Sequence, residues 1–350
     1  MRALEISGPH AVRELTVPIP EIKNDEALIR VAYSGICATD YEILSGEMTL
    51  VREGKIRYPV RFGHEWSGVV EKVGSGVTRF AAGDRVVSDP AIICGTCPAC
   101  RRGEWDACFH KQSVGTVNCW DGSFAEYIRI PERHLHHLPD SISLKQAALI
   151  EPAGIALEGI RKMKDVRGKT VLVIGTGAIG MTSVAFAKYS GAARVLLAGR
   201  TDTKLEIGKA MGADRTINIT KENLAEAVAA ETDGRGVYGT VETSGNIDAV
   251  SQCPELTASK GYVAYIGFYD QYAGRFPIDT VVSREQTVCG VMGHIGTARL
   301  VMEALQTGRV DLMPIVTHII SFDEARDTML HPEHLEGTRI KILVDMQSRP

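Results

Sequence analysis

The sequence predicts an α/β protein of two domains, a β-rich domain followed by a domain built on a doubly wound parallel sheet. Two observations lead to this prediction. The chain has 350 residues, more than the roughly 250 to 300 at which a single hydrophobic core stops growing. The pattern of the sequence also changes near Gly168, from short alternating runs to apolar segments that alternate with helical patterns.

Short alternating or β-branched runs, punctuated by Gly, Pro or Asp, fill the sequence up to about residue 150. The clearest of them are ALIRVAYS (27–34), SGVVEKV (67–73), DRVVSD (84–89) and AEYIRI (125–130). We therefore expect a β-rich domain in this part of the chain.

Beyond Gly168, apolar strands and helical patterns follow each other in turn. Strands are expected at 170–175, 194–199 and 216–219, and helices at 178–191, 202–212 and 221–232. Further strands are expected at 239–244, 262–267 and 287–292 and a helix at 297–308, before β-like runs at 313–320 and 339–346. Repeated β-α units predict a parallel sheet with helices on both faces.

Composition excludes several classes of protein. Hydrophobic residues make up 44% and charged residues 23%, an ordinary globular balance. The net charge of -4 and the lack of a Lys/Arg cluster argue against nucleic acid as a partner. The sequence shows neither a signal peptide pattern nor an apolar run of about 18 residues, so we expect a cytoplasmic protein without a membrane partner.

A glycine-rich turn marks a nucleotide site. Strand 170–175 runs into Gly175, Gly177 and Gly180, with Ala178 and Ile179 between the last two, in the pattern G-x-G-x-x-G at the start of a helix. Glycine lets the backbone approach a pyrophosphate, and the helix N-terminus offers N–H groups and partial positive charge. The strand, turn, helix and later β-α units stand in the order that a dinucleotide site requires.

The residue that follows the second strand indicates which dinucleotide binds. An acidic residue normally holds the adenosine ribose of NAD there, but this chain has Gly199, followed by Arg200 and, one helical turn later, Lys204. A guanidinium offers a 2′-phosphate charge-assisted hydrogen bonds. NADP is therefore favoured over NAD, the alternative being that Arg200 is a solvated residue at a helix start.

Four of the eight cysteines crowd into one loop. Cys94, Cys97, Cys100 and Cys108 have the spacing C-x2-C-x2-C-x7-C. Four thiolates close a tetrahedral shell around zinc, which would make this metal structural. An iron-sulfur cluster is the chemical competitor for the same ligands.

A second set of metal-ligand types is spread along the chain: Cys37 in GICATD, His64 and Glu65 in FGHEWSG, and Glu151 in LIEPAG. Taken singly, each is better explained as a core residue or a solvated carboxylate. The set gains weight because the same chain carries a nucleotide fingerprint and a four-cysteine loop.

Together these motifs resemble the zinc-containing medium-chain alcohol dehydrogenases, and within them the branch of sorbitol and threonine dehydrogenases. The resemblance covers essentially the whole chain, through GICATD (35–40), GHEWSG (63–68), VGSGVTRFAAGDRV (73–86), the cysteine loop, GSFAEY (122–127), Glu151-Pro152 and the nucleotide fingerprint. It implies a GroES-like catalytic domain of residues 1–153 and 293–350, and a Rossmann nucleotide-binding domain of residues 154–292.

The resemblance also implies the roles of individual residues. Zinc would be held by Cys37, His64 and Glu151, where Glu151 stands in place of the second cysteine of the alcohol dehydrogenases, as in the polyol and threonine enzymes. The fourth position would be left for water or substrate, and Glu65 would be an alternate ligand or would hold the zinc-bound water. Asp40 would accept a hydrogen bond from His64, or would simply cap a turn.

Proton transfer and nicotinamide binding follow from the same resemblance. Thr39 would pass the substrate proton towards the ribose hydroxyl, and Glu42 or water would carry it outwards. The backbone at Thr243, Ser244 and Gly245 and at Ile266 and Gly267 would face the nicotinamide. Candidates for the substrate pocket are Tyr41, Trp66, Phe124, Phe268 and His294.

The function expected from this resemblance is oxidation of a secondary alcohol of a polyol, cyclitol or sugar derivative to a ketone, with two zinc ions per subunit, in a homotetramer or homodimer. Three alternatives stay open: a threonine-type amino-alcohol dehydrogenase, a zinc-free quinone or enoyl reductase, and a nucleotide-binding protein whose site has decayed. The intact Cys37, His64 and Glu151 set argues against the reductase. Remaining histidines and cysteines are read as surface residues (134, 136, 137) and core residues (119, 253, 289).

Overall fold

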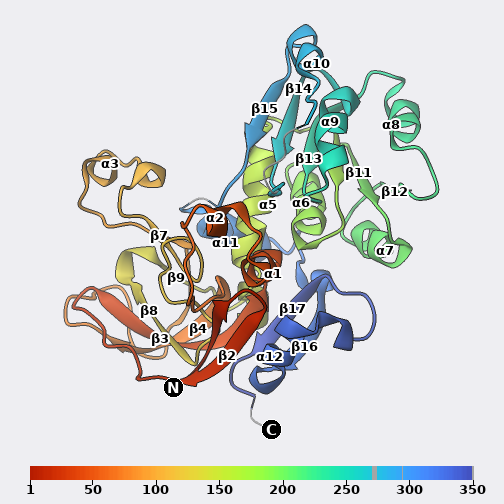
Figure 1. Cartoon of the computed structure of the whole chain (residues 1–350). Helices are drawn as coiled ribbons and strands as arrows, with labels where there is room; N and C mark the ends of the chain where they lie inside the picture. The colour runs from red at the N-terminus through yellow and green to blue at the C-terminus, as the bar shows by residue number, and fades with distance from the viewer. Residues whose placement is uncertain (270–273, 294, 349–350) are drawn as a thin grey trace. The chain divides into compact units, whose positions relative to one another are not determined.

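The computed structural model describes residues 1–269, 274–293 and 295–348, which form two compact units (Figure 1). The first unit comprises Met1–Glu151, His294–Gln306 and Val316–Pro350. The second comprises Pro152–Gly293 and Thr307–Ile315. Among the described residues, no helix combines the length and the apolar character that crossing a bilayer requires.

A seven-stranded sheet organises the first unit, and it joins segments from both ends of the chain. Its order is β16 (Val316–Ser321), β17 (Lys341–Asp345), β3 (Glu26–Ile36), β4 (Glu65–Val73), β5 (Arg85–Ser88) and β9 (Leu135–His137), with β8 (Tyr127–Pro131) also paired to β3. The C-terminal strand β17 therefore lies directly beside β3, as the β-like pattern of the tail allowed. Two smaller sheets pair β1 (Arg2–Gly8) with β2 (Ala11–Thr16) and β6 (Ala91–Ile92) with β7 (Gln112–Ser113).

The helices of the first unit are short. They are α1 (Ala38–Ser45), α2 (Thr49–Arg52), α3 (Pro98–Arg101), α4 (Leu144–Ala147), α11 (Thr297–Gln306) and α12 (Phe322–Leu330), with single 3-10 turns at Trp105–Ala107, Glu132–His134 and Pro332–His334. The core of the first unit is apolar, and within it the rings of Phe62 and Phe124 stack with centroids 4.5 Å apart. Helix α5 (Ile150–Lys162) begins in the first unit and continues into the second.

The second unit is built on a six-stranded parallel sheet. Its order is β12 (Arg215–Asn218), β11 (Arg194–Gly199), β10 (Thr170–Ile174), β13 (Val237–Glu242), β14 (Thr257–Tyr265) and β15 (Thr287–Gly290). The strand order reverses between β10 and β13, which is where doubly wound sheets bind ligands. This arrangement confirms the predicted Rossmann-type fold.

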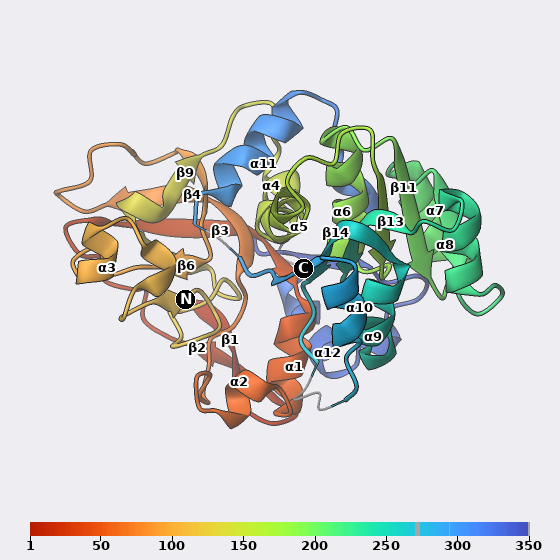
Figure 2. The same ribbon diagram turned by 90° about the horizontal axis from the view of Figure 1, so that it is seen from above.

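Helices flank this sheet (Figure 2). They are α6 (Ala178–Tyr189), α7 (Asp202–Ala210), α8 (Leu224–Thr232), α9 (Ile247–Leu256) and α10 (Ile278–Ser283), with a 3-10 turn at Met313–Ile315. The sequence pattern did not reveal α9, which contains Pro254 near its end and is capped by Asn246, whose side chain accepts the N–H of Asp248. Proline and the short apolar face hide this helix from a search for periodicity.

Candidate active site

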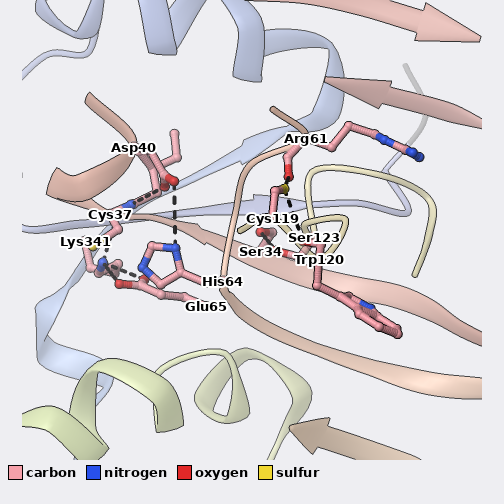
Figure 3. Close-up of polar contacts among 11 residues, drawn as sticks. Ser34, Cys37, Asp40, Arg61, His64, Glu65, Cys119, Trp120, Ser123 and Lys341 are labelled. Carbon is pink, nitrogen blue, oxygen red and sulfur yellow. Dashed lines mark hydrogen bonds and ion pairs between the residues drawn. The ribbon is translucent and has the colours of Figure 1, made fainter. Parts of the chain in front are cut away.

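Antiparallel pairing of β3 and β4 brings Cys37 and His64 together. Gly35 of β3 lies opposite Glu65 of β4, so the residue after β3 and the residue before β4 meet at the same edge. Ligand atoms of Cys37, His64 and Glu65 all lie within 4.8 Å of one another (Figure 3). Although burial lowers the pKa of His64, the adjacent Cys37 thiol raises it well above its ordinary value. A thiol and an imidazole thus face the same point.

Glu65 is held by a buried lysine that sequence reasoning missed. Lys341 of β17 places its Nζ 2.7 Å from Glu65 Oε1 and 2.6 Å from Glu65 Oε2 (Figure 3). Both side chains are buried, at 4% and 1% exposure. The only signal in the sequence was a lysine directly before the apolar run 342–344, and nothing there identified its partner.

Asp40 contacts the backbone rather than the imidazole ring. Its Oδ2 accepts the N–H of Cys37 at 2.9 Å, which caps helix α1. Its Oδ1 lies 3.8 Å from His64 Nδ1, an ion-pair distance that is too long for a hydrogen bond. Of the two expected roles of Asp40, it is therefore the capping of a turn that corresponds to the hydrogen bond formed. Burial raises the pKa of the Asp40 carboxyl to about 6.

Glu151 stands at the start of α5 with one carboxylate oxygen buried and without a hydrogen-bond partner among the described residues. It lies outside the 4.8 Å group, which contains Glu65 instead. Burial raises its pKa to about 7, and its charge interacts with those of His64 and Glu65. Glu151 therefore belongs to the same electrostatic neighbourhood.

The donor atoms of this cluster fit a metal ion. His64 Nδ1, Glu151 Oε2 and Asp40 Oδ1 are buried polar atoms with no hydrogen-bond partner in the described part of the chain. Such atoms are rare in folded proteins unless something else satisfies them. Thiolate, imidazole and carboxylate are the ligand types that zinc takes.

Helix α1 places two further candidates on one face. Thr39 and Glu42 are three residues apart, a spacing that makes them neighbours on a helix surface. Both side chains are half-buried. The hydroxyl of Thr39, two residues after Cys37, is thus followed by a carboxylate one turn further along the helix.

The four loop cysteines also fit a metal. Sulfur atoms are 3.9 Å apart for Cys94 and Cys100, 3.5 Å for Cys97 and Cys100, and 3.7 Å for Cys94 and Cys108. A tetrahedral zinc with Zn–S bonds of about 2.3 Å requires S···S separations of about 3.8 Å. Backbone N–H groups of Thr96 and Cys97 lower the pKa of the Cys94 thiol, which favours the thiolate form that binds metal.

This loop is anchored by a histidine that was expected at the surface. His134 is buried, at 1% exposure, and its Nε2 accepts the N–H of Ile93, the residue before Cys94. Its neighbours behave differently, since His136 contacts Asp89 at 2.9 Å and His137 is half exposed. The surface interpretation is therefore wrong for His134.

At the nucleotide fingerprint, glycine is required sterically. Gly175 adopts φ +115°, and a Cβ on Gly180 would lie 2.0 Å from the carbonyl oxygen of Gly175. Gly177 caps α6 and is exposed, and Ala178 and Ile179 form the first turn. The helix N-terminus is thus open above the carboxyl edge of the sheet.

The residues expected to select between NAD and NADP lie at the end of β11 and just after it. Gly199 is buried, and a Cβ there would lie 2.3 Å from the Thr176 methyl. Arg200 is exposed and Lys204 is half-buried. The space that an acidic side chain would enter from position 199 is therefore filled by Thr176.

The two segments expected at the nicotinamide touch each other. A Cβ on Gly267 would lie 2.9 Å from the Gly245 Cα. Glu242, another residue that sequence reasoning missed, is buried and accepts the Ser244 N–H at 2.7 Å and the Tyr269 hydroxyl. The carboxylate of Glu242 thus fixes the backbone that follows β13. Two further contacts hold this region: Thr243 donates its hydroxyl and its N–H to the Ile174 carbonyl oxygen, and the Ile266 N–H donates to the Glu242 carbonyl oxygen.

Several expected pocket residues serve the core instead. Trp66 is 3% and Phe124 is 1% exposed, and both belong to the core of the first unit. Tyr41 donates its hydroxyl to the Thr328 carbonyl oxygen at 3.3 Å. Phe268 remains partly exposed, at 37%, and His294 lies outside the described residues.

Comparisons with known proteins agree with this arrangement. Residues 23–140 match the family model of the alcohol dehydrogenase GroES-like domain, and residues 178–306 match that of the zinc-binding dehydrogenase. The chain is 30% identical to the sorbitol dehydrogenase of Bacillus subtilis over 98% of this chain and 97% of the relative. It is 33% identical to the L-threonine 3-dehydrogenase of Bacillus velezensis over 88% of each chain. A zinc-binding dehydrogenase of Sinorhizobium meliloti, whose structure was solved bound to NADP, superposes with a TM-score of 0.90 at 30% identity over 99% of both chains.

Proposed function

Because the chain belongs to the zinc-containing medium-chain alcohol dehydrogenases, oxidoreductases that act on CH–OH groups, we propose that it oxidises a secondary alcohol of a polyol, cyclitol or sugar derivative to a ketone, with NADP as the hydride acceptor. The observations that carry this proposal are the meeting of Cys37 with His64 and the unpartnered, buried oxygen of Glu151, whose charge interacts with that of His64.

In this proposal Cys37, His64 and Glu151 hold one zinc, and the four loop cysteines hold a second. A zinc bound by the first set supplies Lewis-acid chemistry, lowering the pKa of an alcohol hydroxyl so that its carbon releases hydride readily. The second zinc would be held by four thiolates, which would leave no coordination position for substrate and would make its role structural.

The chain's own residues move the proton and arrange the site. Thr39 relays the hydroxyl proton of the substrate, accepting it while donating its own proton towards the ribose hydroxyl of the cofactor, and Glu42, on the same face of α1, or water carries the proton outwards. Asp40 keeps Cys37 in place through its backbone N–H.

The proposed substrate class follows from the carboxylate ligand. Glu151 makes the ligand set harder than one with two thiolates, which suits substrates that offer a second hydroxyl to the metal. Polyols, cyclitols and sugar acids have adjacent hydroxyls of this kind.

NADP as cofactor rests on the end of β11. Gly199 brings no carboxylate that would repel a 2′-phosphate, and the exposed guanidinium of Arg200 and the ammonium of Lys204 attract it. The relative of Sinorhizobium meliloti that was solved with NADP supports this choice.

A second candidate is an amino-alcohol dehydrogenase acting on threonine, favoured by the 33% identity to an L-threonine 3-dehydrogenase. A panel of polyols, cyclitols, sugar acids and threonine, assayed for zinc-dependent NADP reduction, separates the two. We expect the highest kcat/KM with a polyhydroxylated substrate, whereas a preference for threonine selects the second candidate.

Three further properties complete the proposal. Residues 1–153 and 293–350 form the GroES-like catalytic domain, and residues 154–292 the Rossmann domain. The protein works in the cytoplasm. It forms a homotetramer or homodimer, which light scattering of the purified protein tests.

A further inference from the structure

Two histidines and a glutamate gather on the surface of the first unit, and none of them belongs to either proposed zinc site. His331, Glu333 and His334 each offer a ligand atom, and these atoms all lie within 4.8 Å of one another. The rings of His331 and His334 stack with centroids 5.0 Å apart and an interplanar angle of 21°. All three side chains are exposed, so an ion in solution has access to them.

The local backbone explains why the two rings meet. Residues Pro332–His334 form a 3-10 turn, in which side chains three residues apart lie above one another. The His334 N–H donates to the His331 carbonyl oxygen at 3.0 Å, which closes this turn. The turn therefore presents both imidazoles on the same side.

Both ends of the turn are fixed to the rest of the first unit. Before the turn, the His331 N–H donates to the Asp327 carbonyl oxygen at 2.7 Å and so caps α12. Leu330 and Leu335, on either side of the turn, pack against the core of the first unit. Because the backbone is already in place, binding an ion requires only that the exposed side chains become ordered.

A further carboxylate orients one of the two rings. Asp327 Oδ2 lies 2.9 Å from His334 Nδ1. Since a carboxylate only accepts hydrogen bonds, Nδ1 carries the proton of the imidazole, and Nε2 keeps its lone pair. A histidine that donates from one ring nitrogen to a carboxylate while the other binds the ion is the usual arrangement at metal sites.

The types of ligand select the class of metal ion. Glu333 Oε1 lies 3.4 Å from His331 Nδ1, so a carboxylate oxygen stands beside the imidazole pair. Two imidazoles with one carboxylate suit the divalent ions of zinc, nickel and copper. Magnesium and calcium ions instead take oxygen ligands.

We propose that His331, Glu333 and His334 form a surface site for one divalent transition metal ion. The two histidines each supply an imidazole nitrogen and Glu333 supplies a carboxylate oxygen, while water fills the remaining positions. Asp327 is a positioning residue that holds the ring of His334. Because the site is exposed, it binds its ion more weakly than the two proposed zinc sites, and dialysis empties it.

The test titrates Ni²⁺ into the dialysed, zinc-containing full-length protein and measures the heat of binding. The titration is run at about pH 8, above the ordinary imidazole pKa of about 6.5. We expect one Ni²⁺ to bind per chain with no loss of zinc, as elemental analysis of the titrated protein checks. His331→Ala and His334→Ala should each lose this binding. Asp327→Asn should weaken it by about tenfold to a hundredfold, as expected for a partner that only orients a ligand.

His137→Ala is the matched control. His137 is also an exposed histidine, and its Nδ1 lies 3.8 Å from a carboxylate oxygen of Asp84, but it belongs to none of the groups of metal-ligand side chains found among the described residues. This variant should bind Ni²⁺ as the parent does.

Where a variant does not fold, the parent itself is labelled with diethyl pyrocarbonate, and the modified histidines are mapped by peptide mass spectrometry. Ni²⁺ should protect His331 and His334 and leave the labelling of His137 unchanged. Equal labelling of all three with and without Ni²⁺ contradicts the proposed site.

A parent that binds no Ni²⁺, or a folded His331→Ala or His334→Ala variant that binds it with parent affinity, overturns the inference. Glu151→Ala should keep the Ni²⁺ site, because the site shares no residue with the proposed catalytic zinc. Failure of the proposed function and failure of this inference are thus separate results.

Discussion

Two buried carboxylates of the candidate active site have pKa values that their surroundings shift upwards. Burial is the largest cause that raises the pKa of Glu151 to about 7 and that of Asp40 to about 6, while their oxygens Oε2 and Oδ1 lack hydrogen-bond partners in the described residues. A cation placed among these carboxylates would lower their raised pKa values, because it favours the charged form, and it would also satisfy the oxygen lone pairs that lack a hydrogen bond. The site is therefore better suited to holding a metal than to being empty.

Arg200 is predicted to determine cofactor preference. Arg200→Ala should lower kcat/KM for NADP by about tenfold to a hundredfold, because a hydrogen bond to a charged group contributes about 1.5–3 kcal/mol. The value for NAD should change little. Lys209→Ala, at an exposed lysine further along α7, is the control and should leave both values unchanged. A parent enzyme that prefers NAD by tenfold would refute this assignment.

His134 is predicted to make the cysteine loop sensitive to acid. Burial lowers its pKa from 6.5 to about 4, so the folded state binds the proton less well than the unfolded state. The stability due to neutral His134 is complete above pH 6.5 and is lost as the pH falls towards 4, by up to about 3 kcal/mol.

Thermal unfolding measured across this pH range checks the prediction. His134→Gln keeps an acceptor for the Ile93 N–H but does not titrate, so its Tm should fall less steeply with acid than that of the parent. Equal slopes for the two proteins would show that His134 plays no part.

At the scale of elements, the pairing of strands brings together residues whose contact cannot be seen in the local sequence. The sequence predicted the strands of the parallel sheet from their apolar runs, and it predicted Cys37, His64 and Glu151 from motifs. It did not reveal the ion pair of Glu65 with Lys341, because the two residues are 276 positions apart and meet only through β3. Trp66 and Phe124 were expected in the substrate pocket because aromatic side chains suit a pocket as well as a hydrophobic core. Only the observed packing assigned them to the core.

The four-cysteine loop is predicted to be a structural element. Cys97→Ser should lose one metal ion per chain and lower Tm by at least about 5 °C, since a structural metal contributes directly to folding free energy. The turnover of chains that remain folded at low temperature should persist. Cys289→Ser, at a half-buried cysteine of β15, is the control and should keep the full metal content. Iron with a visible cluster absorption in the parent would contradict the zinc assignment.

For the whole molecule, the chain divides its tasks between two units. The first contains every proposed metal ligand, and the second contains the nucleotide fingerprint at the point where its strand order reverses. The β-α alternation made the second unit predictable, because parallel sheets need a helix between successive strands. The pattern of the sequence predicted the first unit only as β-rich, and it was the family resemblance that joined the C-terminal segment to it, since its sheet pairs strands from both ends of the chain.

The most direct test of the account is the zinc content of the purified parent and of Glu151→Ala, measured by elemental analysis per chain. We predict two zinc ions in the parent and one in the variant, which should still bind NADP but should no longer turn over the alcohol. A Glu151→Ala protein that retains two zinc ions and its activity would contradict the proposed active site.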